Sequence, residues 1–191
     1  TTHFSYNQME QLREEIDALG GKTSYQYNEL GYLTQVTNPN GHATQLSYTP
    51  TAQVKEVIQA DGSSIVNEYD ALDRLIKQTQ SSGLITEYSY DAANRLIAAK
   101  DNQSLNESYT YNAAGNRLTT TNSLGQTTSM TYDSYNQLTK VTYADGSSES
   151  YTYDLSGNLA TKTDVEGHET SYHYDENGNL QKKVDHLGRE T

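Results

Sequence analysis

The chain has 191 residues, of which 33% are hydrophobic, with 17 Tyr, one Phe, no Trp and no Cys. Its formal net charge of −12 argues against nucleic acid or anionic lipid as a partner, and the lack of cysteine excludes disulfides and thiolate metal sites. No apolar stretch reaches the roughly 18–20 residues that cross a bilayer. A composition this polar and charged is typical of disorder, so a folded state must rely on the tyrosines for burial.

A 21-residue repeat runs through the whole chain. Because tandem units of this length contact mainly their neighbours, we predict a single array of about nine repeats over residues 1–191. The array begins and ends within a repeat, and we expect it to be a fragment of a longer one. The repeat is marked by tyrosines spaced 21 residues apart, at Tyr6, Tyr27, Tyr48, Tyr69, Tyr90, Tyr111, Tyr132, Tyr153 and Tyr174. A glycine follows each of them by 14 residues, with Ser104 as the one substitute, at Gly20, Gly41, Gly62, Gly83, Gly125, Gly146, Gly167 and Gly188.

Each repeat opens with a predicted strand that ends at the repeat tyrosine. In residues 23–27 and 170–174, large rings alternate with small polar side chains, which is the period of a strand with two different faces. The following segment has the pattern Tyr-Asp-x-x-Gly-x-Leu. Its Asp, Asn and Gly residues favour a turn of four or five residues.

A second strand begins at the leucine or valine six residues after the repeat tyrosine, as in residues 33–37, 54–58 and 138–142. The sixth repeat departs from the pattern, since Leu118 stands seven residues after its tyrosine, and we interpret it as slipped by one residue. The second strand ends at pairs such as Asn40-Gly41, Asp61-Gly62 and Asp145-Gly146, which favour two-residue type I′ turns. The sequence therefore predicts an all-β, coiled single-layer sheet of tandem antiparallel hairpins, about 18 strands in all, with tyrosines and leucines alternating along one face.

This unit resembles the YD repeat of rearrangement-hot-spot (Rhs) proteins, wall-associated proteins, the shell subunits of insecticidal toxin complexes and animal teneurins. Residues 90–96, 153–159 and 174–180 match it closely, whereas residues 6–12 and 48–54 match poorly. The resemblance implies that the hairpins form part of a hollow β-shell that often encloses a C-terminal toxin. The Pro-rich, Asp-Pro-containing segment that ends the shell in bacterial members has no counterpart here, so neither shell closure nor self-cleavage transfers to any residue.

We expect a non-catalytic, structural wall segment of a large secreted or cell-surface container, more typical of bacteria than of eukaryotes. Its expected partners are the flanking repeats of the same chain and an enclosed polypeptide cargo. The alternative is an adhesive array that binds glycans by stacking on Tyr25, Tyr88, Tyr109, Tyr151 and Tyr172. When the strip is excised, its open sheet edges are expected to pair with other copies.

No pattern in the sequence predicts a catalytic, cofactor or metal site. His168 and His173 are five residues apart, which places them on opposite faces of a strand, so we interpret His42 and His168 as polar residues flanking a turn. Asp175, with Asn177 and Asn179, resembles the start of a calcium loop. The glycine comes too early and no bidentate Glu follows, so an Asx-type turn is the better interpretation.

Overall fold

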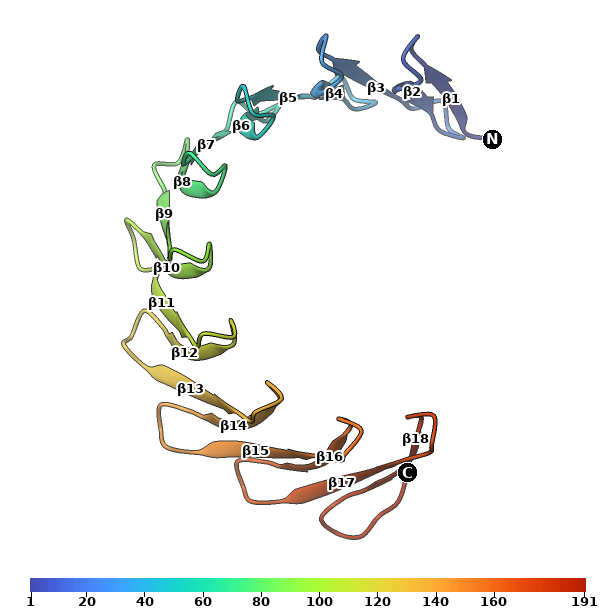
Figure 1. Ribbon diagram of the computed structural model, residues 1–191. Helices are drawn as coiled ribbons and strands as arrows, with labels where there is room; N and C mark the ends of the chain where they lie inside the picture. Colours follow the sequence, from blue (N-terminus) through green and yellow to red (C-terminus); the bar gives the residue numbers. More distant parts are fainter. The chain divides into compact units, whose positions relative to one another are not determined.

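The computed structural model describes residues 1–191 and contains 18 strands and no helix (Figure 1). Nine repeats with two strands each account for all of them, which confirms the predicted all-β fold. The chain has no helix long and apolar enough to span a membrane. The strands are β1 His3–Tyr6, β2 Leu12–Ile16, β3 Lys22–Tyr27, β4 Leu33–Thr37, β5 Ala43–Tyr48, β6 Val54–Ile58, β7 Ser64–Tyr69, β8 Leu75–Gln80, β9 Ile85–Tyr90, β10 Leu96–Asp101, β11 Asn106–Tyr111, β12 Arg117–Thr121, β13 Thr127–Tyr132, β14 Leu138–Thr142, β15 Ser148–Tyr153, β16 Leu159–Thr163, β17 Glu169–Tyr174 and β18 Leu180–Val184.

The chain divides into two compact units, residues 1–88 with 101–103 and residues 89–100 with 104–191. Within the first unit each strand from β1 onward pairs antiparallel with the next, up to the start of β9. The second unit continues in the same way from β10 to β18. Strand β1 pairs on one side only, with β2. Strand β18 pairs with β17 and, through Val184, makes a single bridge to Glu190.

The strand register places tyrosines and aliphatic residues together on one face. Tyr25 lies opposite Val36 and Tyr27 opposite Leu33, and residues directly opposite in an antiparallel pair share a face. The residue just before each repeat tyrosine, such as Gln26, points to the other face and is exposed. The predicted ladder of tyrosines and leucines is therefore present.

A β-bulge lies beside the repeat tyrosine in eight hairpins. In β3–β4, for example, the register shifts between Gln26 and Tyr27, so Leu33 and Thr34 together face Tyr27. Leu33 and Val36 are three positions apart, and in a regular strand their side chains would point to opposite faces. The extra residue brings both onto the tyrosine face.

Except at residues 101–105, both ends of the repeats use one kind of turn, and the predicted two-residue type I′ turn is wrong. In the turn at 38–42, the Gly41 amide donates to the Asn38 carbonyl and the Asn38 amide donates to the His42 carbonyl. Type I′ needs positive φ at both central residues, but only Gly41 has it, at 81°, and Asn40 does not. The loop is therefore a three-residue type I turn closed by a left-handed residue.

The turn after each repeat tyrosine has the same design, with its left-handed residue four positions after the tyrosine. Glycine holds this place in four repeats, at Gly31, Gly115, Gly157 and Gly178. In the other five, an L-residue adopts positive φ, at Glu10, Ala52, Asp73, Asn94 and Asn136. Asn and Asp tolerate this region better than Ala or Glu, so Ala52 and Glu10 carry the larger backbone strain.

The sixth repeat is not slipped, contrary to the interpretation of Leu118. Arg117 lies opposite Tyr111 and takes the place of the usual leucine. Its guanidinium carbon lies 4.6 Å from the centre of the Tyr109 ring, a cation–π contact that compensates for the missing aliphatic contact.

The sheet has no sealed core. Ala99 is the only buried hydrophobic residue, and no side chain is completely buried. Its stability must therefore come from partly buried cross-strand pairs and from hydrogen bonds between neighbouring strands and turns.

Candidate functional site

The hydroxyl of the repeat tyrosine binds the main chain of the preceding repeat. Tyr27 Oη donates to the carbonyl of Leu12 at 2.9 Å, and Leu12 lies outside the β2–β3 ladder, which begins at Glu14. The hydroxyl thus satisfies a carbonyl that the bulged strand start leaves unpaired. The same bond, at 2.7–2.9 Å and always to the residue 15 positions earlier, is made by Tyr48, Tyr69, Tyr111, Tyr132 and Tyr153. Phe has no hydroxyl for this bond, which explains why tyrosine fills the position.

An oxygen just after the repeat tyrosine organises each turn. The first residue of the turn accepts the amide of the residue four positions later, and in most turns also that of the residue two positions later. These acceptors are the side chains of Asn7, Asn28, Thr49, Asp70, Asp91, Asn112, Asp133, Asp154 and Asp175. The predicted Asx-type turn at Asp175 is therefore present.

These hydrogen bonds keep the turn carboxylates ionised. The Arg74 side chain lowers the pKa of Asp70, and the backbone amide and guanidinium of Arg95 lower that of Asp91. The hydrogen bond from the backbone amide of Asn158 likewise lowers the pKa of Asp154. These carboxylates act as fixed acceptors within their own turns.

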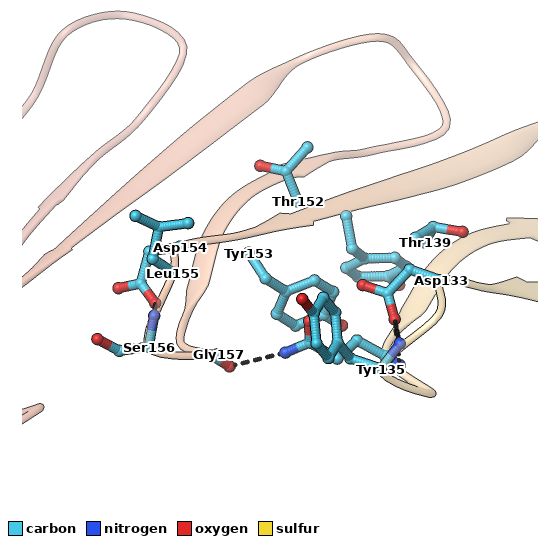
Figure 2. A pocket seen from close by; sticks show the side chains of 11 residues that line it. Asp133, Tyr135, Thr139, Thr152, Tyr153, Asp154, Leu155, Ser156 and Gly157 are labelled. Carbon is cyan, nitrogen blue, oxygen red and sulfur yellow. Dashed lines mark hydrogen bonds between the residues drawn. The ribbon is translucent and has the colours of Figure 1, made fainter.

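Neighbouring turns are joined by the side chain five positions after the tyrosine. Gln11 Nε2 donates to the carbonyl of Gly31 at 2.8 Å, and Gln137 Nε2 donates to that of Gly157 at 3.1 Å, the bond that reaches Gly157 in Figure 2. Asn116 donates to Asn136 Oδ1 in the same way, at 2.8 Å. Sequence reasoning missed these links. The available signal was an amide or arginine side chain at this place in eight of the nine repeats, with Tyr32 as the exception.

Shallow grooves lie between successive turns that follow the repeat tyrosines. One of them has a volume of about 540 Å³, and its lining includes Asp133, Tyr135, Tyr151, Tyr153 and Leu155 (Figure 2). Tyr135 stands at the tip of its turn with 83% of its surface exposed. Related grooves lie beside Tyr69 and Tyr174. The groove in Figure 2 thus combines one accessible aromatic ring, that of Tyr135, with carboxylates and hydroxyls.

The five tyrosines predicted to stack on glycans are all half-buried. Three of them carry a cation over the ring: Arg117 over Tyr109, Lys162 over Tyr151 at 5.6 Å, and Lys183 over Tyr172 at 6.0 Å. A cation on one face leaves less of the ring open to a ligand. Tyr25 and Tyr88 are the other two members of the set.

Two of these hydroxyls are also held by glutamates. Tyr109 donates to Glu107 Oε2 at 2.6 Å, and Tyr151 donates to Glu149 Oε2 at 2.5 Å. The hydrogen bond to Glu107 raises the pKa of Tyr109, and burial followed by the bond to Glu149 raises that of Tyr151. Both hydroxyls therefore remain neutral donors.

Two family models match the chain. The teneurin YD-shell model matches residues 64–189, and the RHS repeat model matches residues 11–43. No curated protein matches the chain.

Solved structures with the same fold include complexes of TcdB2 and TccC3. The complex with Cdc42 superposes with a TM-score of 0.63 at 17% sequence identity, and the complex without the hypervariable C-terminal region with a TM-score of 0.62 at 17%. In both cases the match covers 95% of this chain and 13% of the other, so this chain spans about an eighth of the neighbour's length. Since the YD-shell model alone matches about two thirds of the residues, the chain belongs to the teneurin YD-shell family.

Proposed function

We propose that this chain is a non-catalytic wall segment of a large secreted or cell-surface container that surrounds a polypeptide cargo. The observation that carries the proposal is the tyrosine bond from one repeat to the main chain of the preceding one, repeated along the sheet. A sheet joined this way extends by adding repeats and needs no core of its own. Membership of the YD-shell family and the likeness in fold to the TcdB2–TccC3 complexes support the same role.

The test is a structure of the full-length protein together with limited proteolysis. We expect these repeats to form part of a closed hollow wall, and the enclosed segment to resist protease until the wall is denatured. The isolated cargo segment, treated with the same protease, is the control. An open strip with a cargo segment that is cleaved as fast as the isolated one would refute encapsulation.

A second candidate function, glycan binding, is favoured by the groove at Tyr135 and Tyr151. The exposed Tyr135 ring beside carboxylates and hydroxyls suits a sugar, which presents an apolar face and a polar rim. A glycan array should then show saturable binding that free sugar competes away and that Tyr135→Ala abolishes. Tyr143→Ala, at the opposite end of its repeat, is the matched control. If both variants bind alike, or if no glycan binds, this candidate is wrong.

A further inference from the structure

The hairpin turn between β16 and β17 gathers three side chains that can ligate a metal. It comprises residues 164–168, with the sequence Asp-Val-Glu-Gly-His. His168 Nδ1 lies 3.5 Å from Asp164 Oδ2 and 3.3 Å from Glu166 Oε2. One ligand atom from each of the three residues lies within 4.8 Å of the other two. All three side chains are partly exposed, so an ion can reach them from solvent.

A second imidazole lies against the first. His186, from the corresponding turn of the next repeat, stacks on His168 with ring centres 4.0 Å apart and planes 20° from parallel. This contact limits the orientations open to the His168 ring. Two imidazoles and two carboxylates therefore meet where two neighbouring repeats adjoin.

The donor set selects the class of metal. Ligands held about 2.1 Å from a tetrahedral ion lie about 3.4 Å apart, which matches both distances from the His168 nitrogen. Imidazole suits zinc, nickel and copper, whereas calcium and magnesium take six or more oxygen ligands. We propose that Asp164, Glu166 and His168 bind a divalent transition-metal ion such as Zn²⁺, with His186 positioning the His168 ring.

The second repeat contains the same turn without this donor set. In residues 38–42, Asn-Pro-Asn-Gly-His, Asn38 Oδ1 accepts the amides of Asn40 and His42, as Asp164 Oδ1 accepts those of Glu166 and His168. Two amides replace the two carboxylates, and Ala60 occupies the place of His186. The turn therefore forms without a glutamate or a stacked imidazole, so its folding accounts for the acceptor at Asp164 but not for Glu166 or for the stacked His186.

The test is calorimetric titration of the 191-residue chain with ZnCl₂ in a non-chelating buffer. We expect one site, with affinity lowered at least about tenfold by His168→Gln, since loss of an outer-shell partner alone costs 10–100-fold. The matched control His42→Gln should leave affinity unchanged, and His186→Ala should weaken it less than His168→Gln. Cobalt should give a visible absorption band that zinc abolishes.

A gain-of-function variant makes the test independent of damage to the native turn. Asn38→Asp combined with Asn40→Glu recreates the three ligands around His42 and should raise the stoichiometry from one ion to two. Far-ultraviolet circular dichroism should be unchanged in every variant. The proposal is overturned if His168→Gln binds zinc as tightly as the parent, if His42→Gln is equally impaired, or if Ca²⁺ competes at equal concentration, because each result describes a diffuse acidic surface.

Discussion

Replacing Tyr153 by Phe removes one hydroxyl and tests whether the tyrosine bond holds the repeats together. Tyr153 Oη donates to the Leu138 carbonyl at 2.9 Å, and Leu138 lies outside the β14–β15 ladder, which begins at Lys140. A hydrogen bond of this kind contributes about 0.5–1.5 kcal/mol net, and a fully buried carbonyl left without a donor costs about 1–3 kcal/mol. The site is only half-buried, so water replaces part of the loss, and we expect a destabilisation of about 1 kcal/mol.

Thermal unfolding followed by circular dichroism should show a midpoint lowered by about 2–4 °C for a chain of this size. Native-state hydrogen exchange should show reduced amide protection in β14–β16, because a destabilised repeat affects mainly the repeats next to it. Tyr135→Phe is the control, since that hydroxyl stands at an exposed turn tip. Equal stability of the two variants would refute the role assigned to the tyrosine bond.

Three further predictions concern the turns and the edges of the sheet. Ala52 and Gly146 both have positive φ, which glycine adopts more easily than alanine. In urea unfolding, Ala52→Gly should therefore stabilise the chain by about 0.5–1 kcal/mol, and Gly146→Ala should destabilise it by about 1 kcal/mol. Effects of the opposite sign would contradict the strain argument. The pKa of Asp154 is lower in the folded chain than the value of about 3.9 in the unfolded chain, so the ionised carboxylate stabilises the fold above pH 3.9. This stabilisation is lost as the pH falls through the folded pKa. Asp154→Asn should therefore make the unfolding midpoint depend less steeply on pH at acid pH. The isolated chain, with β1 paired on one side, should form open oligomers that grow with ionic strength as its charge of −12 is screened; a monodisperse monomer by light scattering at all salt concentrations would show that the edges cap themselves.

The sequence was sufficient for the repeat, the two strands and their faces, because strand period and tyrosine spacing are local signals. It was insufficient for the turn at Asn40-Gly41, since the pair fits type I′ and also a type I turn with only Gly41 left-handed. Asn38, which accepts two amides, is the residue that distinguishes them. The sequence did not reveal that Arg117 takes the position of the usual leucine, because a search for aliphatic residues does not find an arginine that contacts tyrosine by a cation–π interaction.

The cluster at Asp164 and His168 was missed for a related reason. Strand geometry separates His168 from His173, and that pair was the natural one to consider. A tight turn instead folds residues two and four positions apart around one point, which brings Asp164, Glu166 and His168 together. The stacked His186 comes from the next repeat, so finding it requires the register between the repeats.

The acceptor of the tyrosine bond is a main-chain carbonyl, so the bond between repeats does not depend on the side chain of the acceptor residue. Leu12, Val54 and Arg117 receive the hydroxyl equally well, although their side chains share neither shape nor charge. Two repeats that differ in the side chain at the acceptor position can therefore still be joined by this bond. The addition, loss or exchange of a whole 21-residue repeat would therefore leave this bond available at the new junction, whatever side chain the acceptor residue carries.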